Sequence, residues 1–419
     1  MKVVCWSFSQ FANDGVRGGM EQLRNLPLSL MFLDVFKGPN QRPRRSQQGI
    51  AILYRSIKFI LLLKKLRKEN CRNKLRMASQ RQNNVVHLDE NVLIPTTGGL
   101  RLACKLWTVK GRAAIDHSMR LICYPGWLDN SGSFDIPAEL LCKDYGFAVL
   151  AVDPPGCGLS DHRPQSSLYN DFEEAPMVAD IADELGWDVF GLVAHSRGAG
   201  VCALAAGLLG NRVKVFVCID SHFALSGMWF EDLRIKGPLA VRKMEQARNM
   251  AKKNMTREAR VFATFQDAVD ANMNNPWFKK SEATARNIVK RHLRPHKDGY
   301  TFTHDVRTYG QNQYLHLSDQ PLIDFLVSIT APVLQMLDGA RWNRISKIDE
   351  SALKIMSGRS KYIKSGLTVV QMDDKGHHFH SDAAREFCDI AGPWMIQNWN
   401  KSSTSVKLGP EGAAVSSRL

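Results

Sequence analysis

Short apolar runs alternate with helix-like segments through most of the chain beyond residue 85. Continuous apolar runs of strand length occupy residues 120–124, 147–152, 188–194, 213–219, 332–337 and 367–372. Helix-like segments occupy residues 133–145, 177–185, 199–209 and 382–398. Strands that are apolar throughout are buried on both faces, and this alternation is typical of a parallel sheet covered by helices. The pattern therefore predicts an α/β domain with a mostly parallel central sheet.

The pattern begins with a hairpin and is interrupted once. Residues 92–95 and 102–107 are strand-like, and the Thr-Thr-Gly-Gly sequence at 96–99 is a hairpin signal. Residues 227–326 lose the alternation and are rich in Lys, Arg, Met and Asn. We therefore expect a mainly helical cap inserted into the domain. The expected parts are a leader at 1–76, the core at 77–226 and 327–400, the cap at 227–326, and a flexible tail at 401–419.

Basic charge is concentrated in the first 76 residues. The chain has a net charge of +15; residues 1–76 hold 16 Lys/Arg and 4 Asp/Glu, a net of +12, which leaves +3 for the other 343 residues. Because the positive and negative charges of these 343 residues nearly balance, they give no electrostatic reason to expect nucleic-acid binding. The basic segment has three interpretations: a disordered or misassigned leader with the true start at Met77, an Arg-rich targeting segment, or a membrane-surface helix at residues 50–66.

The cysteines and the lengths of the apolar runs argue against a disulfide-rich protein, a zinc protein and a membrane-spanning protein. The nine cysteines are scattered, several lie in apolar runs, and they form no Cys-x-x-Cys pair. This usage predicts reduced thiols in an intracellular protein, without a disulfide framework or a zinc site. The apolar runs are shorter than the ~18 residues that suggest a membrane-spanning helix.

Ser196 carries the strongest chemical signal. Residues 191–200 run as a strand directly into a serine flanked by small residues and then into a helix. A sharp strand–turn–helix elbow exposes such a serine as a nucleophile, and Ala194 and Gly198, two positions away, must be small to avoid a collision. The N-terminus of the following helix favours negative charge developing there. The alternative is a strand–helix turn without chemistry.

Two backbone amides are candidates for an oxyanion hole. Pro125, Gly126 and Trp127 follow the first strand of the parallel set. A glycine in that turn lets the chain bring a backbone N–H over the nucleophile. The amides of Trp127 and Arg197 would then stabilise the oxyanion of an acyl-transfer intermediate. Because both donors belong to the main chain, their side chains matter less than the turn.

A histidine cluster after the last strand supplies the candidate general base. His377, His378 and His380 follow residues 367–372. Parallel strands present their carboxyl ends on one edge, where a base can reach Ser196. We expect His377 to be the base, with His378 as the alternative and His380 supporting the loop. Since no Asp, Glu or Cys stands at a ligand spacing, we expect no metal and no other cofactor.

The carboxylate of a Ser–His–Asp triad has two candidates at strand ends. Its role is to hold the imidazole in one tautomer and to stabilise the imidazolium. Asp338 ends the strand before the histidine strand and is the first choice, and Asp220 ends the strand before the cap and is the alternative. The glycine-rich residues 153–161 lack both nucleotide-binding signatures, so we expect them to support the site.

The segment at residues 125–135 (Pro-Gly-Trp-Leu-Asp-Asn-Ser-Gly-Ser-Phe-Asp) resembles the His-Gly-Trp-Leu-Asp-Asn segment of serine hydrolase-like proteins, capped members of the α/β-hydrolase superfamily. The Ser196 elbow and three further segments are similar in order and spacing: residues 153–160, 302–307 and 376–380. The resemblance spans about residues 90–400. It departs at two positions: Pro125 stands where the family has histidine, and Arg341 falls where many relatives place the acid.

The resemblance implies hydrolysis of an ester, thioester or similar acyl bond of a small molecule, with Ser196 attacking and His377 moving the proton. A dehalogenase or epoxide hydrolase would be expected to carry Asp at the elbow. Four aromatic residues of the cap either line the pocket or pack inside the cap: Trp229, Phe230, Trp277 and Phe278. The competing hypotheses are a catalytically silent binding protein on the same fold and a nucleic-acid- or membrane-associated protein acting through the basic segment.

The final residues Ser417, Arg418 and Leu419 resemble the Ser-Lys-Leu signal for peroxisomal import. The preceding residues 401–416 are polar and rich in Gly and Ser, so we expect the C-terminal tripeptide to be accessible to an import receptor. Serine hydrolase-like relatives are associated with peroxisomes. We therefore expect a peroxisomal location, with the cytoplasm as the alternative.

Overall fold

The computed structural model describes residues 82–223, 249, 252–253, 258–275, 278–310, 320–348 and 350–401. Within these ranges no helix combines the length and the apolar character needed to cross a membrane. Several expectations fall outside them. These are the basic segment 1–76 with its helix at 50–66, the aromatic residues Trp229, Phe230 and Trp277, and the tripeptide Ser417, Arg418 and Leu419.

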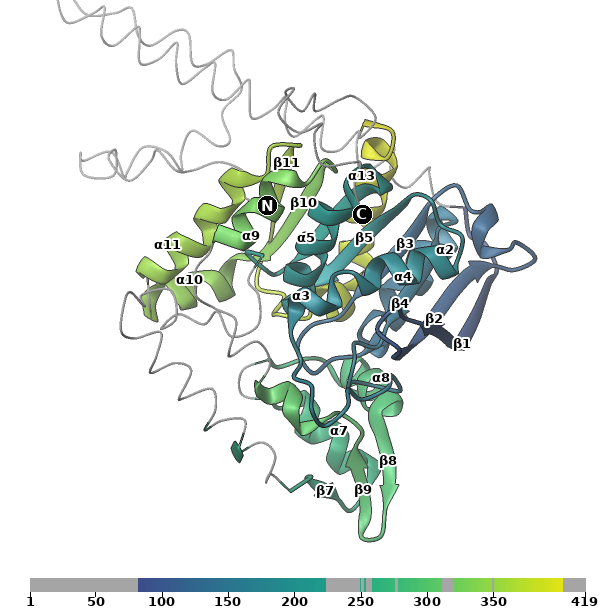
Figure 1. Ribbon diagram of the computed structural model, residues 1–419, viewed down its shortest axis with the longest axis vertical. Coiled ribbons are helices and arrows are strands. Elements are labelled where there is room, and N and C mark those ends of the chain that lie inside the picture. The colour runs from purple at the N-terminus through teal and green to yellow at the C-terminus, as the bar shows by residue number, and fades with distance from the viewer. Residues whose placement is uncertain are drawn as a thin grey trace, which may run out of the picture. The chain divides into compact units, whose positions relative to one another are not determined.

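An eight-stranded, mostly parallel sheet forms the centre of the described chain (Figure 1). Its strands are β1 (Val86–Pro95), β2 (Arg101–Val109), β3 (Arg120–Tyr124), β4 (Ala148–Val152), β5 (Phe190–His195), β6 (Val213–Ile219), β10 (Val333–Asp338) and β11 (Leu367–Met372). They lie in the order β1-β2-β4-β3-β5-β6-β10-β11, and only the β1–β2 and β2–β4 pairs are antiparallel. Each predicted apolar run coincides with a strand to within two residues, which confirms the predicted sheet.

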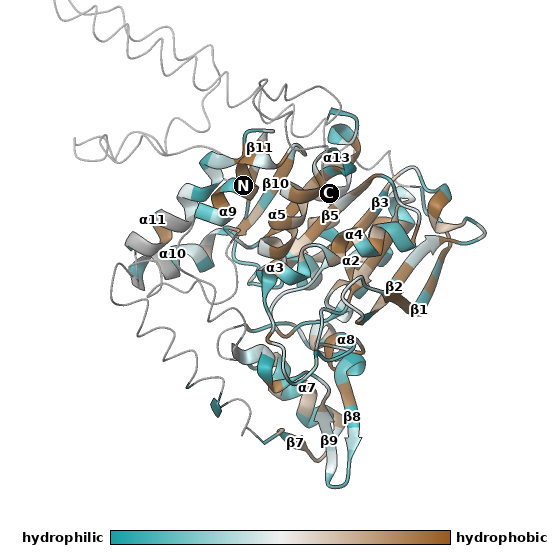
Figure 2. Cartoon of the chain, viewed as in Figure 1, coloured by the Kyte–Doolittle hydropathy of each residue, from teal (hydrophilic) through white to brown (hydrophobic). Residues whose placement is uncertain are grey.

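Helices cover both faces of this sheet. They are α2 (Asp135–Tyr145), α3 (Asp171–Glu174), α4 (Met177–Glu184), α5 (Arg197–Leu209), α9 (Gln320–Ser328), α10 (Gly339–Ile348), α11 (Glu350–Gly358), α12 (Phe379–Asp382) and α13 (Ala384–Asn398). Short 3-10 turns occupy Ala114–Asp116, Ser131–Phe134, Gly210–Arg212, Val306–Gly310 and Arg359–Tyr362. Figure 2 shows hydrophobic residues concentrated on the central strands and on α5.

Alternation along each strand explains the two hydrophobic layers. Ile122 and Leu192 lie in the same buried cluster as side chains of α4, α5 and α9. Their neighbours Leu121 and Val193 lie in the other cluster, with side chains of α2 and α13. Successive side chains of a strand point to opposite faces of a sheet. Strands covered in this way are mostly apolar, which explains the apolar runs in the sequence.

The cap contains a sheet as well as helices. Its described part comprises α7 (Phe265–Met273), α8 (Glu282–His292), β7 (Val261–Phe262), β8 (Leu293–His296) and β9 (Gly299–Phe302), the strands pairing antiparallel in the order β7-β9-β8. The expectation of a mainly helical insertion did not include this sheet. Strands of two to four residues are too short for a hydrophobic period to be recognised.

The cap also ends earlier than expected. Residue 326 was taken as its last, but Leu322 and Leu326 on α9 are buried in the core cluster that includes α5. A Cβ placed on Gly207 of α5 would lie 2.5 Å from the carbonyl oxygen of Phe325. Helix backbones that approach so closely belong to one packed layer. Among the described residues, the core therefore resumes at Gln320.

Candidate active site

Ser196 sits at a strained turn between β5 and α5. Its backbone angles are φ 53° and ψ −118°, a region that residues other than glycine seldom occupy. A Cβ placed on Gly198 would lie 2.4 Å from the carbonyl oxygen of Pro125 and 2.5 Å from that of Tyr124. The elbow therefore packs directly against the end of β3, and position 198 must be a glycine. This is the strand–turn–helix geometry that exposes a nucleophilic serine.

A continuous hydrogen-bond series joins Ser196, His377 and Asp220. The Nε2 atom of His377 lies 2.9 Å from Oγ of Ser196, and its Nδ1 atom lies 2.6 Å from Oδ2 of Asp220. When Nδ1–H donates to the carboxylate, Nε2 carries the lone pair and can accept the serine proton. Ser196 follows β5, Asp220 follows β6 and His377 follows β11. The carboxyl ends of these strands meet at one edge of the sheet.

The expectation that Asp338 contacts His377 was wrong. Asp338 ends β10, but its Oδ1 atom accepts the backbone N–H of Ala340 at 3.0 Å and its Oδ2 atom accepts that of Gly376 at 2.8 Å. Asp338 therefore caps the start of α10 and fixes the residue before the histidine. The alternative choice, Asp220, is the carboxylate that reaches the imidazole.

Several donors surround the Asp220 carboxylate besides His377. Arg341 donates to its Oδ2 atom at 3.0 Å, while the Trp342 indole and the backbone N–H of Asp338 donate to Oδ1 at 2.7 and 3.0 Å. Burial raises the pKa of Asp220, and the Arg341 charge opposes that rise. Burial holds the pKa of His377 well below its ordinary value, and Arg341 adds to the effect. His377 is therefore neutral near pH 7, as a general base must be.

The turn after β3 lies directly against Ser196. A Cβ placed on Gly126 would fall 2.9 Å from Nδ1 of His195 and 3.3 Å from Cβ of Ser196. Only a glycine allows the main chain to approach this closely. Trp127 is the next residue of this turn, and Arg197 is the first residue of α5. The two expected oxyanion donors therefore belong to the two main-chain segments next to Ser196.

The side chains of Trp127 and Arg197 anchor these segments. The Trp127 indole donates to the carbonyl oxygen of Thr308 at 3.1 Å, which ties the turn to the cap side of the site. The guanidinium of Arg197 is buried in ion pairs with Asp171 at 2.8 Å and Glu174 at 2.5 Å. Although burial opposes it, these carboxylates raise the pKa of Arg197. Both side chains therefore stabilise the position of the backbone rather than supply chemistry.

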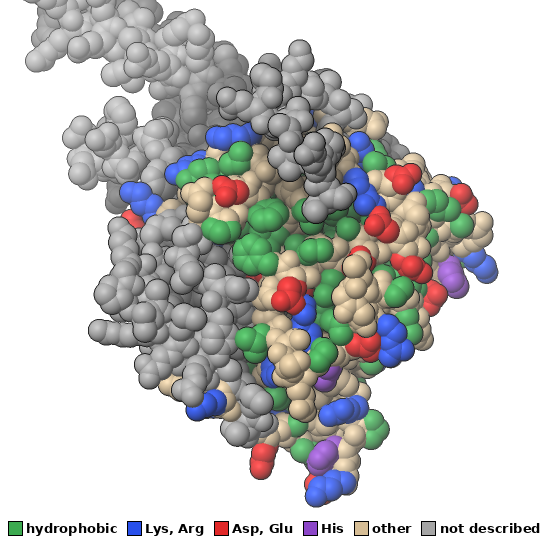
Figure 3. All heavy atoms as spheres, viewed as in Figure 1, with side chains coloured by type: hydrophobic (Ala, Val, Ile, Leu, Met, Phe, Trp, Pro, Cys, Tyr) green, Lys and Arg blue, Asp and Glu red, His purple; other side chains and the backbone are tan. Residues whose placement is uncertain are grey.

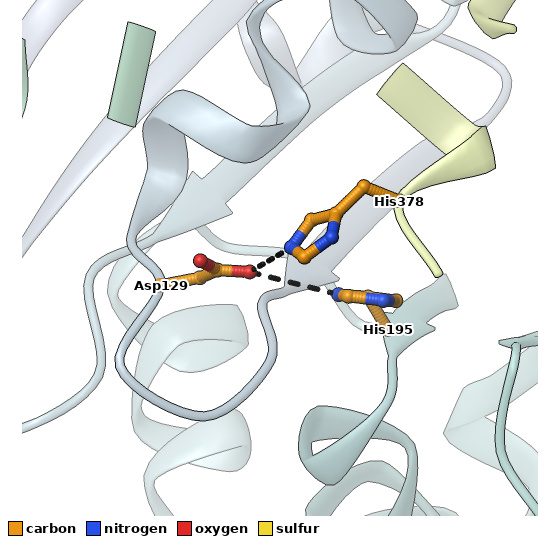
Figure 4. Close-up of side chains that lie close together, drawn as sticks. All are labelled: Asp129, His195 and His378. Carbon is orange, nitrogen blue, oxygen red and sulfur yellow. Dashed lines mark hydrogen bonds and ion pairs between the residues drawn. The ribbon is translucent and has the colours of Figure 1, made fainter. Parts of the chain in front are cut away.

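His378, the alternative base, binds Asp129 instead of the serine. Its Nε2 atom lies 2.9 Å from Oδ2 of Asp129, and Nδ1 of His195 lies 3.8 Å from the same oxygen (Figure 4). Although burial opposes it, His378 and Lys280 hold the pKa of Asp129 well below its usual range. The ring of His380 lies 4.4 Å from that of His195. Asp129 therefore ties the turn after β3 to the loop after β11, whereas among the described residues His380, expected to support that loop, only packs its ring there.

Asp129, His195 and His378 also form a candidate metal site. Within the described ranges, Asp129, His195 and His378 place one candidate ligand atom each within 4.8 Å of one another. Sequence spacing did not anticipate Asp129, which comes from a distant turn. The ammonium group of Lys280 lies 3.9 Å from Oδ1 of Asp129, and a cation so near disfavours a second one. We therefore assign the cluster a structural role.

A cavity of about 290 Å³ lies between Ser196 and the cap. Its core side includes Gly126, Trp127, Ser196 and His377, and its cap side includes Lys280, His292, Phe302, Val306 and Tyr309. Phe278, which was expected either here or in the interior of the cap, lines the cavity with its ring 4.8 Å from that of His377. Lys280 and His292 could not be predicted from the sequence, because the cap carries no pattern that indicates a pocket.

Comparison with known proteins shows which family this chain is similar to. Residues 120–327 match the family described as alpha/beta hydrolase fold. A serine hydrolase-like protein of Dictyostelium discoideum is 28% identical over 330 residues, which cover 77% of this chain and 86% of that protein. A serine hydrolase-like protein of Danio rerio is 29% identical over 225 residues, 53% of this chain and 65% of that protein.

Solved structures agree with this assignment. The hypothetical protein PA1622 from Pseudomonas aeruginosa is 25% identical with a TM-score of 0.61, over 74% of this chain and 100% of that chain. A thioesterase domain from the curacin biosynthetic pathway has the same fold, with a TM-score of 0.55 at 18% identity, over 75% of this chain and 100% of that domain. The chain belongs to the α/β-hydrolase superfamily. Within that superfamily it resembles the serine hydrolase-like proteins.

Proposed function

We propose that this protein is a serine hydrolase that cleaves an ester, thioester or related acyl bond. The observation that carries the proposal is the series from Ser196 through His377 to Asp220, with spacings of 2.9 and 2.6 Å beside a cavity. As Oγ of Ser196 attacks the acyl carbon, His377 accepts its proton. The amides of Trp127 and Arg197 stabilise the oxyanion that forms.

The second half of the reaction uses the same groups. The imidazolium of His377, stabilised by Asp220, returns its proton to the departing alcohol or thiol, which leaves an acyl group on Ser196. Water then takes the place of the leaving group, and His377 removes its proton as it attacks. Collapse of the second intermediate releases the carboxylic acid and restores the serine.

Covalent labelling tests this proposal. A fluorophosphonate probe should label the native protein, and Ser196→Ala should abolish labelling and lower turnover of short 4-nitrophenyl esters by roughly 10³-fold or more. Ser357→Ala, at an exposed serine of α11, is the matched control and should retain both. A folded native protein that is neither labelled nor active would instead support a catalytically silent binding protein on this fold.

A further inference from the structure

The cap presents two buried polar side chains to the cavity that contains Ser196. Lys280 and His292 both line it. The Lys280 side chain is 5% exposed and His292 is 2% exposed. The proposed reaction uses neither of them. A cavity of this size, at the small end of ligand sites, accommodates a short substrate that would contact both the serine and these groups.

Lys280 has more hydrogen-bond donors than acceptors around it. An ammonium group carries three N–H donors. Nζ of Lys280 donates to Oδ1 of Asn272 at 3.2 Å, whereas the nearest oxygen of Asp129, at 3.9 Å, is too far to accept a hydrogen bond. Asp129 therefore balances the charge of the ammonium without satisfying its remaining donors. Within the part of the chain that the structure describes, the group is deficient in acceptors.

His292 shows the same deficiency in a neutral group. Neither of its ring nitrogens has a hydrogen-bond partner among the described residues. Its ring packs 4.3 Å from that of Phe302 and 5.4 Å from that of His304. Burial lowers the pKa of His292 to about 3, and the nearby His304 contributes to this shift. The imidazole is thus neutral near pH 7 and offers one donor and one acceptor.

The charges around the cavity balance in pairs. Asp129 offsets Lys280, and at the exposed part of the lining Glu258 and Arg260 have opposite signs. The pocket therefore lacks hydrogen-bond partners rather than countercharge. A substrate carboxylate would bring a second anion close to Asp129, whereas an uncharged oxygen would satisfy Lys280 and His292 at no electrostatic cost.

We propose that Lys280 and His292 form a subsite for an uncharged oxygen of the substrate, such as an ether, carbonyl or hydroxyl group, so that the protein prefers short oxygen-bearing esters to alkyl esters of the same length. This inference rests on the proposed function. An alkyl chain in the subsite would displace water and leave buried donors unmatched. An oxygen at the same place accepts a hydrogen bond from Lys280.

Esters that differ only by oxygen in place of a methylene group test the preference. On the acyl side, 4-nitrophenyl 3-methoxypropanoate is compared with 4-nitrophenyl pentanoate. On the alcohol side, 2-methoxyethyl acetate is compared with butyl acetate. We expect kcat/KM of the native protein to be roughly tenfold or more higher for the oxygen-bearing ester of one pair. Because inductive activation is the same in every variant, only the change in this ratio between variants measures the subsite.

The ratio of kcat/KM for the oxygen-bearing ester to kcat/KM for the alkyl ester measures the preference. Lys280→Met and His292→Phe should each bring this ratio toward the ratio of the uncatalysed hydrolysis rates of the two esters. His296→Phe, on β8 and outside the cavity lining, is the matched control and should keep the native ratio. If Lys280→Met does not fold because it leaves Asp129 without its cation, His292→Phe decides, since it removes ring nitrogens without changing the charge.

Two outcomes would overturn the inference while leaving the proposed hydrolase intact. In the first, the kcat/KM ratio of the native protein is unchanged in both Lys280→Met and His292→Phe, and this holds for both ester pairs. The second is a strong preference for a monosuccinate ester over both uncharged esters, which would show that the subsite binds an anion. Failure of the proposed function is a separate result, because the native protein would then not react with the fluorophosphonate probe.

Discussion

Asp220 and Asp338 end the adjacent strands β6 and β10, yet their carboxylates meet different partners. Asp220 accepts from His377 and Arg341, whereas Asp338 accepts from backbone amides at the start of α10 and before the histidine. A carboxylate beside the imidazole stabilises the imidazolium of the transition state, while one that caps a helix stabilises the fold. Arg341 donates to Asp220 and is therefore one of the partners of that carboxylate.

Exchange of each aspartate for asparagine separates these roles. We expect Asp220→Asn to lower kcat on the order of 10⁴-fold, because an amide favours the wrong tautomer of His377. Asp338→Asn should lower the free energy of unfolding by about 1 kcal/mol and keep activity within about tenfold. Ester turnover and denaturant unfolding of both variants measure this. Equal losses of activity in the two variants would contradict the assignment.

At the scale of elements, the site depends on the junction between β5 and α5. The backbone of Ser196 is strained, and the first turn of α5 touches the end of β3 through Gly198. The same contact holds the turn that contains Gly126 against the serine. The strain at Ser196 is therefore maintained by packing between two neighbouring strands and one helix.

Gly198→Ala should disturb this junction. Its Cβ would lie 2.4 Å from a carbonyl oxygen of β3's following turn, so we expect a loss of about 1–3 kcal/mol in the free energy of unfolding and a large loss of probe labelling. Gly358→Ala is the control, since no atom lies within 4 Å of its added Cβ. Calorimetry and labelling of the two variants test this, and indistinguishable behaviour would show that the elbow tolerates a side chain.

At the largest scale, the described residues carry charges of both signs on the surface (Figure 3) and bury several histidines inside. On the face shown in Figure 3, acidic and basic side chains of the described residues are interspersed. Five of the buried histidines lie around the site, and burial is the main cause that lowers the pKa of each of these five: His195, His292, His377, His378 and His380. The folded protein therefore holds these rings neutral where the unfolded chain would protonate them.

This arrangement predicts that stability falls with acidification. Since each folded pKa lies below the unfolded value of about 6.5, the unfolded state binds more protons below that pH. Stability is full above pH ~6.5 and declines toward pH 5.5, with a slope of up to about 1.4 kcal/mol per pH unit for each such histidine. Denaturant unfolding at pH 7.5, 6.5 and 5.5 measures this decline. A midpoint that is unchanged or higher at pH 5.5 would contradict it.

Features of this protein that depend on residues close together in the chain could be predicted from the sequence. Mostly apolar runs predicted the strands, because a strand covered on both faces has little contact with water. The Ser196 elbow and the turn at Gly126 were identified for a similar reason, since tight turns admit only small residues. His377 was placed beside the serine because parallel strands end on one edge of a sheet.

Contacts between side chains that are far apart in the chain could be identified only from the folded structure. Asp220 and His377 are 157 positions apart, and Asp129 and His378 are 249 apart. The choice between Asp220 and Asp338 depended on how each side chain is directed at the end of its strand. Lys280 and His292 line the same cavity as Ser196 because the cap packs over the core. No local pattern encodes such contacts, because they arise from the packing of whole elements and not from the hydrophobic period of any one segment.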